Sequence, residues 1–120
     1  MIVRGYSAGI GENIWRPAEC FDKSLAATNS IARALLEGAK TLVFVGSSCM
    51  YPLDAPQPYK ESSLGLGAIE ETSAAHAYAN FAAYAQCKAY SKQYGVNYFT
   101  AIQADVYGRP ESTHFIAQIM

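Results

Sequence analysis

A tyrosine and a lysine stand four residues apart in the stretch YAQCK, which runs from Tyr84 to Lys88. Residues at this spacing share one face of a helix. A nearby ammonium group lowers the pKa of a phenol, and such a phenol can act as a general acid or base. The same spacing also arises on any ordinary helix, so the pair has to be judged by where its helix places it.

The elements that would position these side chains can be predicted from the sequence. The apolar runs MIVRG, TLVFVG and VNYFTAIQA predict strands, and TLVFVG is typical of a strand buried on both faces. PAECFDKSLAATNSIARALLEGAK and ETSAAHAYANFAAYAQCKAYSKQYG predict helices, and STHFIAQIM begins a third. Residues 5–16 are expected to form a loop, and YPLDAPQPYKESSLGLG a long one. The alternation predicts a single α/β domain over residues 1–120, with a three-stranded parallel sheet flanked by helices.

Composition excludes several classes of function. A net charge of −1 with 16% charged residues gives no electrostatic footprint for nucleic acid. No apolar run reaches the roughly 18 residues that would cross a membrane. Cys20, Cys49 and Cys87 are odd in number and lack metal-ligand spacing, which predicts free thiols, no metal site and a cytoplasmic setting.

Four stretches together resemble one family: VFVGSSCMYP, APQPYKE, KAYSKQYGVNYFTAIQADVYGRP and GIGENIWRPAECF. They are similar to segments of the GDP-L-fucose synthases, which are extended short-chain dehydrogenases, and the resemblance covers nearly the whole chain. It implies the C-terminal half of a Rossmann-like, NAD(P)-binding domain. In that family a nucleotide sugar, GDP-4-keto-6-deoxymannose, is epimerised at two carbons and then reduced by NADPH. A cysteine and a histidine move the protons, and a Ser-Tyr-Lys trio handles the ketone.

The resemblance implies roles for the matching residues. Ser47 matches the serine whose hydroxyl stabilises oxyanion character at the ketone. Cys49 matches the cysteine that removes the acidic proton beside the ketone, and His114 matches the histidine that acts as its acid partner. The implied NADP contacts are Gly46, Ser48, Asn80 and Val106. The plain structural alternatives are a polar strand end for the serines, a small core thiol for Cys49 and surface positions for the histidines.

YAQCK is out of register with the family. Ungapped alignment, either forward from GSSC or backward from QYG, puts His76 at the catalytic tyrosine and Asn80 at the lysine. YAQCK starts eight residues later (84 − 76), which is about 12 Å along a helix and roughly 80° around it. His76 is therefore the candidate proton donor and Asn80 a candidate ribose ligand. Tyr84 and Lys88 are expected to be an ordinary pair on one helix face.

Further departures from the family concern the cofactor. Asp105 replaces a family asparagine in ADVYG, which sets a carboxylate beside the expected nicotinamide. By alignment the chain begins at about the fourth strand, so the family's glycine-rich loop and its C-terminal substrate domain are expected outside these residues. An alternative interpretation takes Gly5, Gly9 and Gly11 as a cofactor loop. Pro17 opposes it, because a proline in the second turn of the next helix costs about 3 kcal/mol.

Three functions stay open. The first is a truncated relative of the GDP-L-fucose synthases, with nucleotide sugar and NADP as implied ligands, that cannot run the full reaction. The second is an α/β binding or oligomerisation module without chemistry. The third is a residual keto-sugar-nucleotide epimerase that uses Cys49 and His114. The apolar first strand would present a free edge, which predicts a homodimer or higher assembly that covers it.

Overall fold

The protein is described by a computed structural model over residues 1–6 and 9–104. Three parallel strands, β1 (Ile2–Arg4), β2 (Thr41–Ser47) and β3 (Asn97–Gln103), form one sheet in the order β1-β2-β3. Helix α2 (Pro17–Leu36) lies between β1 and β2 in the chain, and helix α3 (Ala74–Tyr94) lies between β2 and β3. The predicted α/β class and three-stranded parallel sheet are confirmed.

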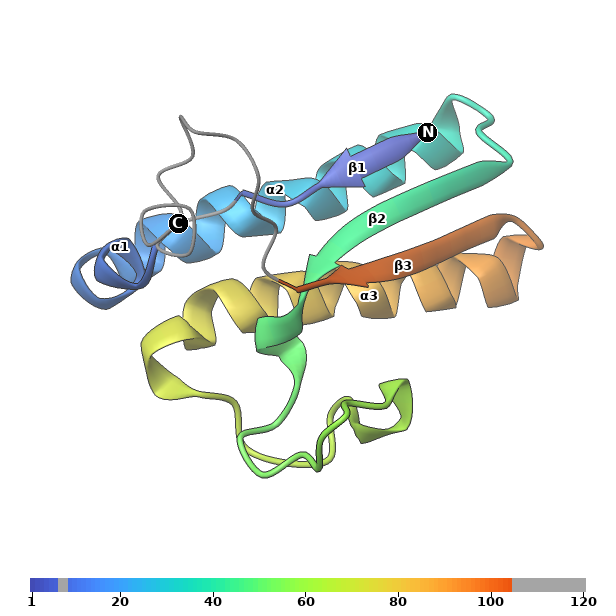
Figure 1. Cartoon of the computed structure of the whole chain (residues 1–120). Coiled ribbons are helices and arrows are strands. Elements are labelled where there is room, and N and C mark those ends of the chain that lie inside the picture. The colour runs from blue at the N-terminus through green and yellow to red at the C-terminus, as the bar shows by residue number, and fades with distance from the viewer. Residues whose placement is uncertain (7–8, 105–120) are drawn as a thin grey trace, which may run out of the picture.

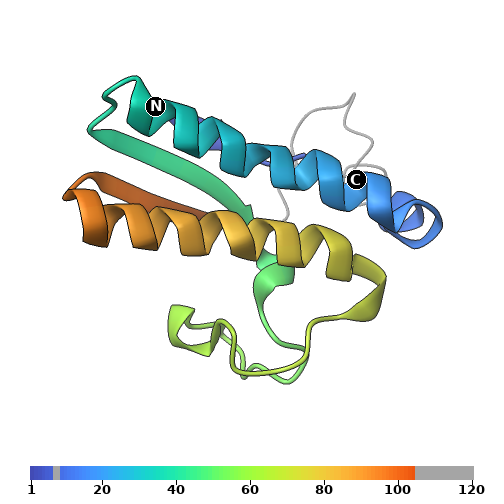
Figure 2. The same ribbon diagram turned by 180° about the vertical axis from the view of Figure 1, so that it is seen from behind.

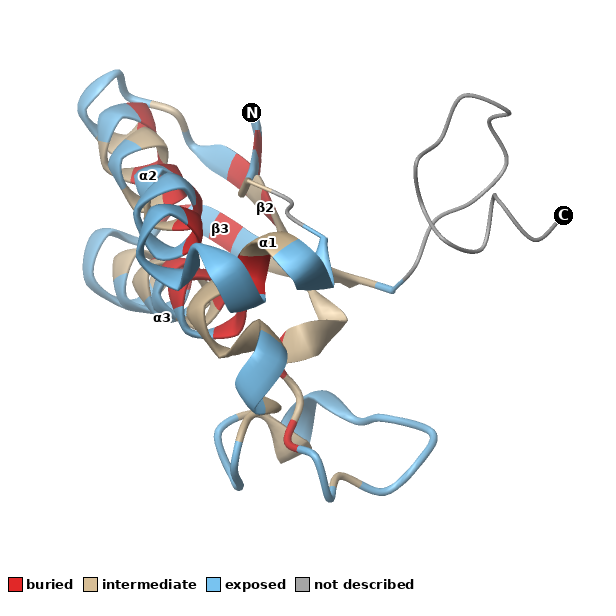
Figure 3. Cartoon of the chain, turned by 90° about the vertical axis from the view of Figure 1, so that its left-hand side faces the viewer, coloured by how far each residue is buried: buried red, intermediate tan, exposed pale blue. Residues whose placement is uncertain are grey.

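Both long helices cover the same face of the sheet (Figures 1 and 2). Side chains alternate between the two faces of a strand, so every second residue points at the helices. The buried residues gather between the helices and the sheet (Figure 3). Those at the centre of this core are Val3, Ile31, Leu42, Phe44, Ala83 and Tyr98.

The opposite face of the sheet is much less covered in the described part of the chain. Ile2 pairs with Val43 and Val43 pairs with Phe99, which sets three apolar side chains in one row across the sheet. Ile2 is 75% exposed and Phe99 is 47% exposed. The expectation that TLVFVG is buried on both faces is therefore wrong for the described residues. The reason is that α2 and α3 lie on the same side, so only alternate residues of β2 are covered.

Local sequence explains where the helices begin and end. Pro17 is the first residue of α2, where its missing N–H costs no helical hydrogen bond. Gly95 ends α3 in the left-handed region with φ 66°, and its N–H donates to the carbonyl of Ser91 at 3.1 Å. No helix in the described ranges is long and apolar enough to cross a membrane.

One short helix was not expected. Residues 5–16 were predicted as a loop, but α1 (Ile10–Trp15) forms there. The Tyr6 hydroxyl donates to the Glu12 carboxylate at 3.0 Å, and the side chain of Asn13 is buried, so tertiary contacts hold a helix that propensity alone does not predict. The helix ends before Pro17, so no long helix follows Gly11 as a cofactor loop would require.

The long loop between β2 and α3 has an internal structure of its own. It contains the short 3₁₀ turns η2 (Glu61–Ser63) and η3 (Glu71–Ser73), and the latter leads into α3. The N–H of Leu53 donates to the carbonyl of Ala68 at 2.9 Å and closes the base of the loop. The rings of Tyr51 and Tyr59 stack with centroids 4.7 Å apart. The helix predicted from STHFIAQIM lies outside the described residues.

Candidate functional site

The carboxyl ends of the three parallel strands lie along one edge of the sheet, together with α1 and the beginning of α3 (Figure 1). In open α/β sheets, ligands bind outside this edge. Two groups of predicted site residues lie here: one follows β2, and the other is on α3.

The first group is the serine-cysteine turn that follows β2. The N–H of Cys49 donates to Ser47 Oγ at 3.3 Å and begins the 3₁₀ turn η1 (Ser48–Met50), which packs against α3. Cys49 is partly exposed, whereas Cys20 and Cys87 are buried. The turn therefore presents Cys49 as the accessible thiol among the three free cysteines.

Gly46 leaves space for this turn. A Cβ at position 46 would lie 3.1 Å from Met50 Cε and 3.1 Å from Thr100 Cγ2, closer than well-packed carbon atoms approach. A side chain at residue 46 would therefore force Met50 and Thr100 to shift by a few tenths of an ångström. This close packing supplies a structural reason for the glycine that needs no cofactor.

The second group is centred on His76, in the first turn of α3. Its Nδ1 lies 3.2 Å from Ser24 Oγ on α2, and Ser24 Oγ also donates to the carbonyl of Tyr6 at 3.5 Å. Burial lowers the pKa of the imidazole. At neutral pH the ring is therefore uncharged, because an unperturbed histidine already titrates near 6.5. These contacts link α2, α3 and the segment that follows β1.

Asn80 completes this cluster one turn further along α3. It is only 2% exposed, and its Nδ2 donates to the carbonyl of His76 at 2.8 Å. Its Oδ1 faces Gly5 at the end of β1. Nδ2 is also 3.3 Å from both ring nitrogens of His76, so it lies over the face of the ring rather than along either nitrogen lone pair.

Tyr84 and Lys88 lie elsewhere on α3. Lys88 is exposed, and its Nζ lies 5.3 Å from the centroid of the Tyr84 ring, a cation–π contact within one helix. Tyr84 also packs against Phe81, with ring centroids 5.5 Å apart. A Cβ on Gly65 would lie 3.2 Å from Phe81 Cζ, so this part of the helix meets the long loop. The pair makes a local surface contact and takes no part in the His76 cluster.

The serine-cysteine turn and the His76 cluster lie at the same edge of the sheet but, among the described residues, do not contact each other through hydrogen bonds. Within the described ranges no hydrogen bond links His76 or Asn80 to Ser47, Ser48 or Cys49. Asp105, Val106 and His114 lie outside the described residues. No group of three potential metal ligands occurs in residues 1–6 and 9–104.

Sequence reasoning missed Ser24 and Asn13. Ser24 occupies a buried position on the stripe of α2 formed by Cys20, Ala27 and Ile31. A serine at an apolar stripe position was the available signal, because a buried hydroxyl needs a partner. Asn13 had no such signal, since its helix was not predicted; its Nδ2 donates to the carbonyl of Gly9 at 3.2 Å.

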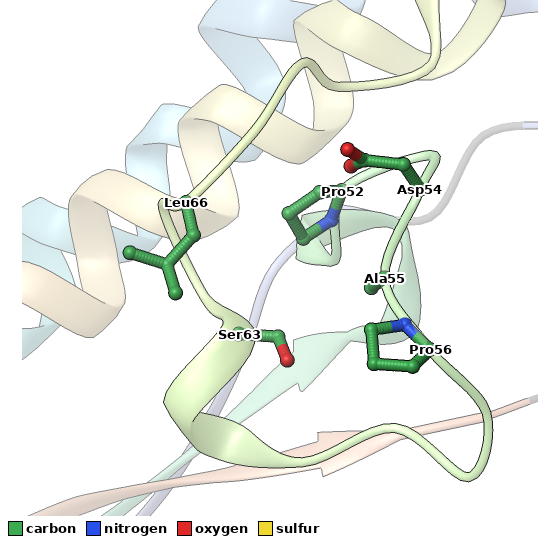
Figure 4. A pocket seen from close by; sticks show the side chains of 6 residues that line it. All are labelled: Pro52, Asp54, Ala55, Pro56, Ser63 and Leu66. Atoms are coloured by element: carbon green, nitrogen blue, oxygen red, sulfur yellow. The ribbon is translucent and has the colours of Figure 1, made fainter.

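A small open pocket lies apart from this edge, within the long loop (Figure 4). Its volume is about 150 Å³, and the lining residues are Pro52, Asp54, Ala55, Pro56, Ser63 and Leu66. None of the predicted site residues lines it. The pocket belongs to the packing of the loop.

The described residues do not by themselves fit the dinucleotide that the family uses. Asn80, the aligned ribose ligand, is buried and its amide nitrogen is already bonded to the carbonyl of His76. No lysine or arginine makes a hydrogen bond to His76 or Asn80 in the described part of the chain. A dinucleotide would therefore have to displace existing contacts to reach Asn80.

The parallel sheet, its crossover helices and the polar residues at the carboxyl edge define a partial Rossmann-like α/β domain. The chain belongs to the NAD dependent epimerase/dehydratase family, whose sequence model matches residues 1–120. The GDP-L-fucose synthase of Sinorhizobium fredii is 38% identical over 101 residues, which cover 83% of this chain and 32% of the relative. The GDP-L-fucose synthase of Escherichia coli is 33% identical over 118 residues, which cover 93% of this chain and 36% of the relative.

Two solved structures also match this chain over about a third of their own length. A GDP-D-glycero-L-gluco-heptose synthase from Campylobacter jejuni, in the presence of NADPH, has a TM-score of 0.83 and 30% identity. The match covers 95% of this chain and 34% of the heptose synthase. A GDP-mannoheptose C4 reductase from the same organism, with NADP bound, has a TM-score of 0.82 and 28% identity. The chain thus spans about a third of the length of the relatives that it matches.

Proposed function

We propose that this chain, a relative of the GDP-L-fucose synthases, does not carry out the NADPH-dependent reduction. The observation that carries the proposal is the pair His76 and Asn80, which aligns with the catalytic tyrosine and lysine of that family. Reduction of a ketone needs a proton donor at the carbonyl oxygen, and a neighbouring ammonium group tunes that donor. Asn80 carries no charge and is bonded to His76, and burial keeps His76 uncharged at neutral pH.

The test is an assay of the 120-residue chain with NADPH and GDP-4-keto-6-deoxymannose, followed by the absorbance of NADPH. The GDP-L-fucose synthase of Sinorhizobium fredii is the positive control. We expect no oxidation of NADPH above a protein-free blank. Oxidation that scales with the concentration of the chain and is lost in His76→Phe would overturn the proposal. NADPH binding is measured by calorimetry and not by tryptophan fluorescence. Trp15 is the only tryptophan and is 83% exposed, so its fluorescence is a poor reporter of a bound ligand.

A second candidate is proton exchange on a keto-sugar nucleotide, favoured by the accessible thiol of Cys49. The Cys49 thiolate would take the proton from the carbon beside the ketone, and His114 would return a proton from the other face. The test is incorporation of deuterium from solvent, measured by mass spectrometry. Incorporation abolished by Cys49→Ser but retained in Cys87→Ser would support this activity, since Cys87 is buried in the core. No incorporation at high protein concentration would rule it out and leave the non-catalytic module.

The predicted homodimer or higher assembly belongs with this proposal. Among the described residues β1 is an edge strand, and Ile2 on it is 75% exposed, so this edge offers both backbone groups and apolar surface to a partner. Light scattering should give a mass above that of one chain, and a monomer over the accessible concentration range would contradict it. The cytoplasmic setting remains a prediction; the three free cysteines are compatible with it.

A further inference from the structure

We propose that Ser24 is a positioning residue for His76: it binds the imidazole through Nδ1, so that Nε2 faces a ligand as an unprotonated nitrogen and His76 accepts protons instead of donating them. The inference rests on the proposed function only in taking His76 as part of the site. The ligand group it fits is a hydrogen-bond donor such as a sugar hydroxyl.

The first step is an inventory of hydrogens around Ser24. Its hydroxyl has one hydrogen and lies between two groups, the carbonyl of Tyr6 at 3.5 Å and Nδ1 of His76 at 3.2 Å. A carbonyl only accepts, so it can be satisfied only by the serine hydrogen. The arrangement that satisfies all three groups has Ser24 donating to the carbonyl of Tyr6 and an Nδ1–H of His76 donating to Ser24 Oγ. In a neutral imidazole this leaves Nε2 with its lone pair.

The second step concerns Nε2. Its one side-chain hydrogen-bond contact in the described ranges is with Asn80 Nδ2, at 3.3 Å. That nitrogen is equally far from Nδ1, which puts it over the ring, and one of its hydrogens goes to the carbonyl of His76. The in-plane lone pair of Nε2 is therefore not satisfied by the described residues. His76 is partly buried, so part of the residue lies open to solvent.

The third step is the charge around the ring. The titratable groups on the surrounding elements include Tyr6, Glu12 on α1, Glu19 and Lys23 on α2, and Glu70 and Glu71 at η3. Glu12 is held by the Tyr6 hydroxyl and by Lys23 Nζ at 3.6 Å. Burial is the sole cause of the lowered pKa of His76, so no carboxylate stabilises an imidazolium. The neutral ring is thus the form present near neutral pH.

The consequence is a change of role at this position. In the related family the aligned tyrosine gives a proton to the carbonyl oxygen. A neutral His76 with hydrogen on Nδ1 has none to give through Nε2, and accepts a hydrogen bond or a proton there. The tautomer held by Ser24 therefore decides the direction of proton transfer that the site supports.

The tautomer can be measured directly by ¹⁵N NMR of the imidazole nitrogens. The chain has only two histidines, so His114→Gln leaves one set of signals. We expect Nδ1 to have the shift of a protonated nitrogen and Nε2 that of an unprotonated one. In Ser24→Ala we expect the ring to move to the Nε2–H tautomer, which isolated histidine favours. The measurement needs no activity, so its failure is distinct from failure of the proposed function.

Thr28→Ala is the matched control. It also removes a hydroxyl from α2, but the Thr28 hydroxyl donates to the carbonyl of Leu25 at 2.7 Å, so the tautomer of His76 should not change. If Ser24→Ala does not fold, Ser24→Cys places a side chain of similar size with a weaker acceptor there and should give a mixture of tautomers. An Nε2–H ring in the wild-type chain, or an unchanged ring in a folded Ser24→Ala variant, overturns the proposal.

Discussion

Asn80 on α3 lies close to Gly5, the residue that follows β1: Asn80 Oδ1 is 3.4 Å from the point where a Cβ on Gly5 would be. A Cβ there would be in ordinary van der Waals contact with the amide, so Asn80 packs closely against the chain as it leaves the sheet. This packing places a neutral amide, 2% exposed, at the junction of α3 and the sheet. This position tolerates polarity because the amide nitrogen is bonded to the carbonyl of His76.

A charged side chain at position 80 should therefore lower the free energy of unfolding much more than an apolar side chain that simply lacks the amide. Asn80→Asp should lower the free energy of unfolding by about 3 kcal/mol, because a buried carboxylate loses its hydration and the donor Nδ2 is gone. Asn80→Leu should cost about 1 kcal/mol, since the carbonyl of His76 still receives the helical N–H of residue 80. Urea denaturation measures both. Equal losses in the two variants would contradict the buried, neutral environment.

The lowered pKa of His76 predicts that stability falls in mild acid. As pH drops below about 6.5, the histidine takes up a proton in the unfolded chain before it does so in the folded one. The free energy of unfolding should then decrease by at most about 1.4 kcal/mol per pH unit until the lower folded pKa is reached.

The measurement is urea denaturation between about pH 7 and about pH 5. His114→Gln should keep the pH dependence and His76→Gln should lose most of it. Glu70 does not interfere in this window: its carboxylate accepts from the N–H and hydroxyl of Thr72, which lowers its pKa, so its contribution is lost only at more acidic pH. A pH dependence that survives in His76→Gln would assign it to another group.

The two faces of the sheet should respond differently to the loss of a phenylalanine. Phe44 is fully buried under the helices, whereas Phe99 on the neighbouring strand is 47% exposed on the other face. Phe44→Ala should cost about 3–5 kcal/mol and leave the chain largely unfolded. Phe99→Ala should cost less than about 1 kcal/mol. Thermal and urea unfolding compare them; a large, concentration-dependent cost for Phe99→Ala would show that another copy covers this face.

Gly46 offers a test of the turn that presents Cys49. Gly46→Ala should cost about 1–3 kcal/mol, because the new Cβ would meet Met50 and Thr100. Adding Thr100→Ser removes the methyl group on one side and should recover part of the loss. Gly11→Ala is the control: nothing lies within 4 Å of its Cβ position in α1, so it should stabilise the helix by up to about 1 kcal/mol. A Gly46→Ala variant as stable as the wild type would contradict the close packing.

The positions of residues along α3 could be predicted from the sequence. The motif YAQCK has the right residue types, yet its distance from GSSC predicted that Tyr84 and Lys88 would lie away from the site, and in the structure they form a local pair on the helix surface. Strand and helix positions followed from apolar runs and from the glycines and proline at their ends. These features are local, so the sequence states them directly.

Other features depended on contacts between distant segments. α1 was missed because its six residues are held by Tyr6 and by the burial of Asn13, not by propensity. The half-covered face of β2 was missed because an apolar run shows that a strand is buried but not that both helices lie on one side. Each of these outcomes requires knowledge of which elements pack together.

The sequence by itself determined the parallel α/β order, the strand that ends in Ser47 and Cys49, and the presence of His76 and Asn80 at one register of α3. Only the tertiary structure decided what those residues touch. Ser24 and His76 are 52 positions apart in the chain, yet their side chains lie 3.2 Å apart because α2 and α3 pack side by side on one face of the sheet. Hydrogen bonds between helices depend on that packing geometry, and no pattern within either helix specifies it.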